Sequence, residues 1–142
     1  MIELRLANSD DFNFLYKLKK KTLKEYISKT WDEEWQKDYF IHNFKPDMIQ
    51  IITISGKKIG CIANFEENFC NFLSLIELLP KYQNKGIGTQ LIKDLILKAN
   101  RSNKCIKLQV LKVNNNAQRL YTRLGFSIKG ESETHFQMIY KK

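Results

Sequence analysis

The strongest constraint on the fold is one apolar stripe that follows a glycine-containing segment. Apolar residues recur between positions 87 and 99 at the spacing of a single helix face. They are Ile87, Leu91, Ile92, Leu95, Ile96 and Ala99. Gly86 and Gly88 lie where this helix would begin. A helix with one apolar face needs a second layer to cover it, so the flanking segments are expected to supply a sheet.

The flanking segments have the composition of strands. Strands are predicted at residues 2–6, 48–55, 58–65, 69–79, 105–110, 126–129 and 136–140. Further helices are predicted from residue 9 to about 26, from 32 to about 44, and at 115–124, where Gly125 favours a left-handed stop. The order is βααβββαβαββ, which predicts an α/β sandwich with a mixed, mainly antiparallel sheet. A chain of 142 residues predicts one domain over 1–142.

Composition and cysteine usage exclude several classes of protein. The chain has 43% hydrophobic and 27% charged residues, which is a globular balance. We find no apolar run long enough to cross a bilayer, and the start does not resemble a signal peptide. Cys61, Cys70 and Cys105 cannot all pair within the chain, and none forms a CxxC motif. A disulfide scaffold and a zinc site are poorly supported, so buried thiols in a cytoplasmic protein are expected.

The positive charge is concentrated in the second half of the chain. The formal net charge is +9. Residues 1–71 contain 11 basic and 11 acidic residues, whereas residues 72–142 contain 13 basic and 4 acidic residues. An anionic partner is therefore expected at the second half, and nucleic acid, a membrane surface and a phosphorylated cofactor are the three candidates.

Residues 83–89 are typical of a phosphate-binding connection. Two glycines at a helix N-terminus let backbone amides converge, and the helix dipole favours an anion there. A β–α connection without a ligand is the alternative. Leu91 stands where a Rossmann fingerprint needs a small residue, and no P-loop run of Gly-Lys-Ser/Thr is present.

Two motifs in this region resemble those of the GNAT superfamily of N-acetyltransferases. The run Gln83-Asn84-Lys85-Gly86-Ile87-Gly88 matches the Q/R-x-x-G-x-G/A signature. Residues 114–126 match the N-x-x-A-x-x-x-Y-x-x-x-G-F segment of the same superfamily. The element order also fits, and the resemblance covers essentially the whole chain. Residues 31–36 look like a bacterial subgroup whose acceptor is unassigned.

The resemblance implies acetyl-CoA as the cofactor. Its pyrophosphate would bind residues 83–89, which are Gln83, Asn84, Lys85, Gly86, Ile87, Gly88 and Thr89. Its pantetheine arm would lie between splayed parallel strands, here residues 73–79 and 105–111, and would pair with the backbone at Leu78 and Leu79. Asn114, Ala117 and Tyr121 would also meet the cofactor. A bulge in the first of these strands would turn an amide toward the thioester carbonyl.

The resemblance also suggests two catalytic residues. Tyr121 would protonate the leaving thiolate, and its alternative is packing in the core. Glu77 is the only carboxylate in residues 73–79 and is the candidate general base. Its alternative is a solvent-facing position or a salt bridge. Asn114 would hydrogen-bond the cofactor or a water, or would instead cap the next helix.

The acceptor pocket is expected to combine aromatic rings with carboxylates. Trp31, Glu34 and Trp35 fall between the first two helices, and Glu133 falls near the last hairpin; both are pocket walls in the superfamily. Such groups suit a cationic amine. Helix capping and core packing are the alternatives.

The sequence therefore predicts an N-acetyltransferase that transfers acetyl from acetyl-CoA to a small-molecule or peptide amine by direct attack in a ternary complex. We expect no metal, no nucleic acid and no membrane as partners, and a monomer or homodimer. A non-catalytic acyl-CoA sensor of the same fold is the first alternative. A basic nucleic-acid-binding protein is the second, although no recognition motif is present.

Overall fold

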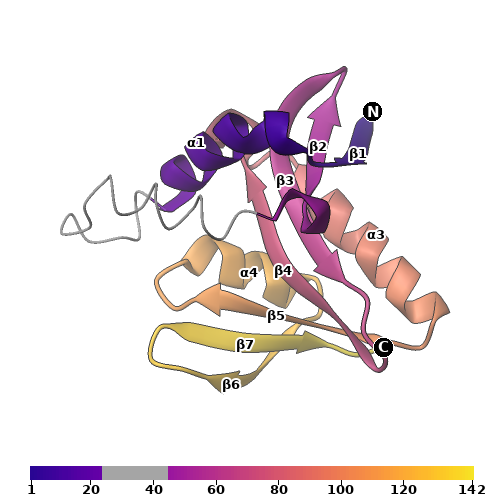
Figure 1. The fold of residues 1–142 in the computed structure, drawn as a ribbon. Coiled ribbons are helices and arrows are strands. Elements are labelled where there is room, and N and C mark those ends of the chain that lie inside the picture. Colours follow the sequence, from indigo (N-terminus) through magenta and orange to yellow (C-terminus); the bar gives the residue numbers. More distant parts are fainter. Residues whose placement is uncertain (24–44) are drawn as a thin grey trace. The chain divides into compact units, whose positions relative to one another are not determined.

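The computed structural model describes residues 1–23 and 45–142 (Figure 1). The strands in these ranges are β1 (Ile2–Leu6), β2 (Gln50–Ile54), β3 (Lys57–Phe65), β4 (Cys70–Leu78), β5 (Cys105–Leu111), β6 (Ser127–Glu131) and β7 (His135–Tyr140). The α-helices there are α1 (Phe12–Leu23), α3 (Ile87–Arg101) and α4 (Asn115–Arg123). Short 3-10 turns occupy Ser9–Asp11, Pro46–Met48 and Pro80–Tyr82. The helix predicted at residues 32–44 lies outside the described residues.

The strands form one mixed sheet in the order β1-β2-β3-β4-β5-β7-β6. β4 and β5 are parallel, and the pairs β1–β2, β2–β3, β5–β7 and β6–β7 are antiparallel. The prediction of a mixed, mainly antiparallel α/β sheet is therefore confirmed. The parallel register runs from Cys70 opposite Cys105 to Leu73 opposite Leu108, while β4 continues to Leu78 and β5 to Leu111.

The strand predicted at residues 48–55 is shorter than expected at both ends. Pro46 begins a 3-10 turn, in which the amide of Ile49 donates to the carbonyl of Pro46 over 3.1 Å. This turn delays the strand to Gln50. At the other end Ser55 and Gly56 have φ angles of +51° and +78°, the left-handed pair that a tight type I′ hairpin needs.

The described chain falls into two compact units. The first unit comprises Met1–Ala63 with Leu75–Gln83, and the second comprises Asn64–Ser74 with Asn84–Lys142. The single domain predicted over residues 1–142 stays a prediction.

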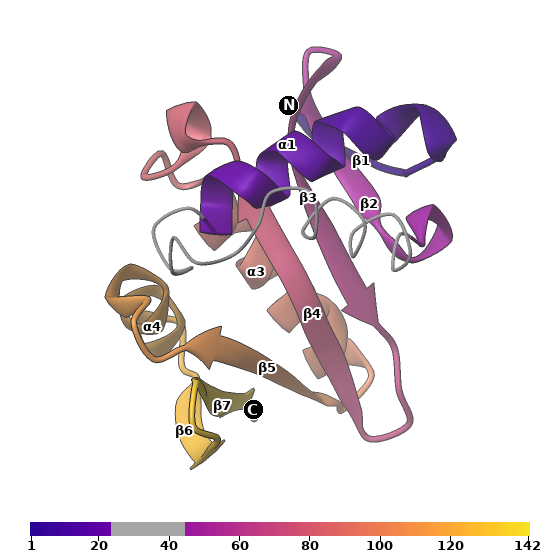
Figure 2. The same cartoon turned by 60° about the vertical axis from the view of Figure 1, so that its left-hand side comes forward.

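The core of the first unit forms where α1 covers β2 and β3. Figures 1 and 2 show α1 lying across these strands. Leu15 and Leu18 of α1 are buried against Ile51 of β2 and Cys61 of β3. The partly buried residues Phe14, Ile49, Leu75 and Leu79 pack around this cluster. The three-residue spacing of Leu15 and Leu18 is the one-face pattern predicted for this helix.

One carboxylate of the first unit is fully buried among cations. Asp11 is 0% exposed and forms a bidentate pair with Arg5, at 2.8 and 2.9 Å. Lys58 lies 2.6 Å from the same carboxylate, and the amide of Asn8 donates to it over 2.9 Å. The hydrogen-bonded Arg5 guanidinium holds the pKa of Asp11 well below its usual range, against the opposing effect of burial. Asp11 therefore ties β1, the start of α1 and β3 together.

The second unit is built on the predicted apolar helix. Leu91, Ile92 and Ala99 of α3 are buried, which confirms the stripe. Alternate residues of β5 are buried as well, at Ile106, Leu108 and Val110. Figure 1 shows β5, β7 and β6 as adjacent ribbons, in agreement with their pairing.

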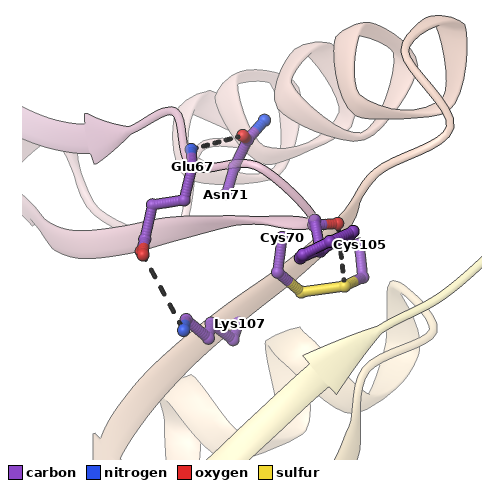
Figure 3. The surroundings of a disulfide bond; sticks show 6 residues. Glu67, Cys70, Asn71, Cys105 and Lys107 are labelled. Carbon is purple, nitrogen blue, oxygen red and sulfur yellow. Dashed lines mark hydrogen bonds and ion pairs between the residues drawn. A yellow bond between two sulfur atoms is a disulfide. The ribbon is translucent and has the colours of Figure 1, made fainter.

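Cys70 and Cys105 form a disulfide, which corrects the expectation of three buried thiols (Figure 3). The two residues are directly opposite in the β4–β5 register, and their Cα atoms are 4.4 Å apart. They are 35 residues apart in sequence, so only the strand pairing shows that they meet. Cys61 is the buried free thiol. With two of the three cysteines in a disulfide, cysteine usage does not support a reducing compartment. The cytoplasmic location stays a prediction.

Candidate active site

The segment between β4 and α3 has a backbone shaped by two left-handed residues. After the 3-10 turn Pro80–Tyr82, Asn84 has a φ of +59° and Gly86 a φ of +82°. The side-chain amide of Gln83 donates to the carbonyl of Leu78 over 3.0 Å, which closes the loop on itself. Gly86 is the N-cap residue of α3. A residue with a Cβ would be strained at this φ, so the glycine has a backbone reason.

The first turn of α3 presents open backbone amides. Gly86 supplies no side-chain cap, and a Cβ built on it would meet nothing within 4 Å. Gln83, Asn84, Lys85 and Gly86 are exposed, and Ile87, Gly88 and Thr89 are half-buried. The exposed Lys81 and Lys85 add positive charge to this segment. Uncapped amides, a helix dipole and two lysines together suit an anion such as a pyrophosphate.

Leu78, the last residue of β4, and Leu79, which follows it, were both expected to pair with the cofactor through their backbones. The amide of Leu79 donates to the carbonyl of Ile59 over 2.8 Å, and the carbonyl of Leu79 accepts from Tyr82. The Leu79 amide is therefore not available to a cofactor. The carbonyl of Leu78 accepts from Gln83. Of the two expected residues, only Leu78 could therefore offer its backbone amide to a cofactor.

β3 approaches β4 closely at Gly60. A Cβ at this glycine would lie 2.1 Å from the carbonyl oxygen of Glu77 and 3.1 Å from the Cα of Leu78. Only a residue without a Cβ fits against that backbone. Gly60 thus allows the backbone of Glu77 and Leu78 to lie this close to β3. Gly60 was not among the predicted site residues, although an isolated glycine inside a strand pattern indicates such a close approach.

Glu77 is paired with a lysine of α1. Its carboxylate Oε1 lies 3.1 Å from the Nζ of Lys19, and the side chain of Glu77 is only 12% exposed. A salt bridge is the alternative to a catalytic base for this residue, and no sequence pattern indicated Lys19 as the partner. Burial raises the pKa of the neighbouring Cys61 thiol, and the Glu77 carboxylate raises it further. Cys61 therefore stays protonated and is a poor nucleophile.

Asn114 acts as the N-cap of α4. Its Oδ1 accepts a hydrogen bond from the amide of Ala117 over 3.1 Å, which is the capping alternative. Gln118, which the sequence analysis did not single out, donates to the carbonyls of Leu111 and Lys112 over 3.1 and 2.8 Å. These bonds fix the connection from β5 to α4.

Tyr121 is buried one helical turn after Ala117. It is 8% exposed, and its ring centroid lies 5.7 Å from that of Phe126. Burial raises the pKa of Tyr121 to about 12. The hydroxyl is therefore protonated at any usable pH, and it can donate a hydrogen bond or a proton.

The residues expected around the acceptor are described only in part. Glu133 is exposed between β6 and β7. Its neighbour Glu131 pairs with Lys112 over 3.1 Å. Trp31, Glu34 and Trp35 lie outside the described residues.

Among residues 1–23 and 45–142 we find no group of three or more His, Cys, Asp or Glu residues that could hold a metal ion. Among the helices of the same ranges, none is long and apolar enough to cross a membrane.

Several known proteins are similar to this chain. Residues 12–126 match the model of the acetyltransferase (GNAT) family. An uncharacterized N-acetyltransferase of Methanocaldococcus jannaschii is 31% identical over 134 residues, which cover 84% of this chain and 57% of that protein. The spermine/spermidine N(1)-acetyltransferase of Bacillus subtilis is 36% identical over 88 residues, which cover 58% of each. The chain thus spans less than two thirds of either relative.

A solved structure has the same fold. The PaiA N-acetyltransferase of Thermoplasma acidophilum, solved in complex with coenzyme A, superposes with a TM-score of 0.80 at 18% identity. The match covers 100% of this chain and 99% of that one. This likeness shows the fold, and the family match over residues 12–126 shows that the chain belongs to the GNAT acetyltransferase family.

Proposed function

We propose that this protein is an N-acetyltransferase that transfers an acetyl group from acetyl-CoA to an amine by direct attack in a ternary complex. The observation that carries the proposal is the uncapped N-terminus of α3 behind Asn84 and Gly86, both left-handed. The two curated relatives named above are acetyltransferases, and the Thermoplasma structure holds coenzyme A.

The cofactor is proposed to bind along the β4–α3 connection, the adjacent strands and the start of α4. Residues 83–89 would bind the pyrophosphate through backbone amides, with Lys81 and Lys85 adding charge. The pantetheine arm would lie beside β4 and β5, with the backbone amide of Leu78 as donor. Asn114 and Ala117 would line the arm from the start of α4. Bound acetyl-CoA would supply an activated thioester, from which an amine takes the acetyl group.

Two side chains would assist the transfer. Glu77 would accept the proton of the acceptor amine, directly or through a water. Tyr121 would donate to the leaving sulfur. A thiol has a pKa of about 8.5, so full proton transfer from a hydroxyl of pKa about 12 is uphill by roughly 5 kcal/mol. Hydrogen-bond donation as the sulfur gains charge is therefore the main contribution that we assign to Tyr121.

The acceptor is proposed to be a small-molecule or peptide amine. Trp31, Glu34, Trp35 and Glu133 would form its pocket, since rings and carboxylates suit a cation. Polyamines are the first class to test, because one relative is named a spermine/spermidine acetyltransferase. We propose a cytoplasmic monomer or homodimer.

We expect the substitution Gly86→Ala to weaken the binding of coenzyme A by about 10-fold or more, because the added methyl group would stand in the open space at the start of α3, where the pyrophosphate is proposed to bind. Isothermal titration calorimetry measures the dissociation constant directly. Gly56→Ala is a matched control, since Gly56 has a φ of +78° and equally open surroundings, so both variants carry the same backbone strain.

The control should bind coenzyme A within about twofold of the wild type. Equal affinity in both variants would remove residues 83–89 from the site. An absence of measurable binding to the wild type would contradict the proposed function as a whole.

A further inference from the structure

Glu77 of β4 forms an ion pair with Lys19 of α1. The two residues are 58 positions apart, both belong to the first unit, and their Nζ–Oε1 distance is 3.1 Å. The side chain of Glu77 is 12% exposed and that of Lys19 is 40% exposed. A carboxylate buried to this degree is costly unless a cation or hydrogen-bond donor accompanies it.

Both partners are held by apolar neighbours. Leu18, adjacent to Lys19 on α1, is 0% exposed and belongs to the core cluster of the first unit. Leu75 and Leu79 flank Glu77 at a spacing of two and pack against the same cluster. Alternate residues of a strand share a face, so Glu77 shares a face of β4 with these leucines, and that face meets α1. The direction of the Glu77 side chain is therefore set by packing as well as by charge.

The same core cluster contains the buried thiol of Cys61, which belongs to β3. Beyond the effect of burial, the Glu77 carboxylate raises the pKa of this thiol further, and the Lys19 ammonium lowers it. Because burial raises the pKa of the thiol, Cys61 remains neutral and does not compete for the charge of Lys19.

We propose that Lys19 is a positioning residue for Glu77: through the 3.1 Å ion pair it holds the carboxylate in the orientation from which it accepts the proton of the acceptor amine. This inference rests on the proposed function, in which Glu77 is the base. Lys19 need not touch either substrate, and its contribution should be to turnover and not to the binding of coenzyme A.

The test compares Lys19→Met, which keeps most of the stem without the charge, with Lys19→Arg, which keeps the charge. Lys17→Met is the matched control, because Lys17 is an exposed lysine on the same helix. We expect Lys19→Met to lower kcat roughly 10-fold with KM for acetyl-CoA unchanged, Lys19→Arg to retain most of kcat, and Lys17→Met to match the wild type. If Lys19→Met does not fold, Lys19→Gln, a neutral hydrogen-bond donor, takes its place.

A double-mutant cycle with Glu77→Gln distinguishes the role of Lys19 from the proposed role of Glu77 as the base. If Lys19 acts through Glu77, adding Lys19→Met to Glu77→Gln costs nothing further in kcat. Additive losses, or a normal kcat in Lys19→Met beside a low kcat in Glu77→Gln, would overturn the role of Lys19 alone. A normal kcat in Glu77→Gln would overturn both the base and its positioning residue. A wild type without activity on any amine would overturn the transferase itself.

Discussion

Tyr121→Phe is expected to lower kcat for acetyl transfer by about 100-fold, with KM for acetyl-CoA changed by no more than about twofold. The ring is retained, so its packing against Phe126 at 5.7 Å persists. Only the hydroxyl is lost, and burial keeps that hydroxyl protonated by raising its pKa to about 12. A donor that acts on the departing sulfur stabilises the transition state more than the bound substrate, and its loss is therefore seen in kcat.

A second tyrosine of the same aromatic cluster provides the control. The ring of Tyr140 also lies 5.7 Å from Phe126, and its hydroxyl accepts a hydrogen bond from Asn100 over 3.3 Å. Tyr140→Phe should keep kcat within about twofold of the wild type. Steady-state kinetics with detection of free thiol measures both variants. A normal kcat in Tyr121→Phe would exclude the donor role, and equal losses in both variants would point to packing instead.

The substitution Asp11→Asn is expected to lower the free energy of unfolding at pH 7 by about 3 kcal/mol. The variant keeps the shape of the side chain but places an amide NH₂ against the donors of Arg5 and Lys58, at a position that is 0% exposed. Arg5 and Lys58 are partly exposed and can regain water, which keeps the loss moderate. Urea unfolding followed by fluorescence measures the difference.

The difference should depend on pH in one direction. The pKa of Asp11 is lowered in the folded chain, mainly by Arg5, so its stabilising effect is complete above the unfolded value of about 4. The effect is lost as the pH falls below that value toward the lower folded pKa. The difference in unfolding free energy between the wild type and Asp11→Asn should therefore shrink progressively as the pH is lowered below about 4.

Asp10→Asn is the matched control, because Asp10 is the adjacent residue and is exposed. It should unfold at nearly the same urea concentration as the wild type. An Asp11→Asn variant that is as stable as this control at pH 7 would show that the buried ion pairs contribute nothing net.

Features set by local sequence were predictable. The apolar stripe in α3, the start of that helix at Gly86 and the left-handed stop at Gly125 each depend on neighbouring residues, and each is where the sequence predicts it. The parallel pairing of β4 with β5 was implied by the resemblance to the GNAT superfamily. Strand β2 ends at Ile54 because Ser55 and Gly56 form the hairpin turn, and this pair can be read in the sequence.

Features that join distant segments were not predictable. Cys70 and Cys105 meet because β4 and β5 pair in one register, and no cysteine spacing reports that register. Lys19 belongs to a basic run that looks like solvated surface, and only the packing of α1 brings it to Glu77. Asn114 caps α4, and its residue type did not decide between a helix cap and the cofactor contact that the resemblance implies.

The most direct test of the account is an assay of acetyl-CoA with a panel of amines: polyamines, amino acids, aminoglycosides, and peptides with a free amino terminus or a lysine. Free thiol and the mass of the product are measured together. We predict that at least one amine releases thiol and gains one acetyl group in equal amounts, at a rate reduced in Tyr121→Phe. Coenzyme A binding without thiol release for any amine would contradict the transferase and identify an acyl-CoA sensor.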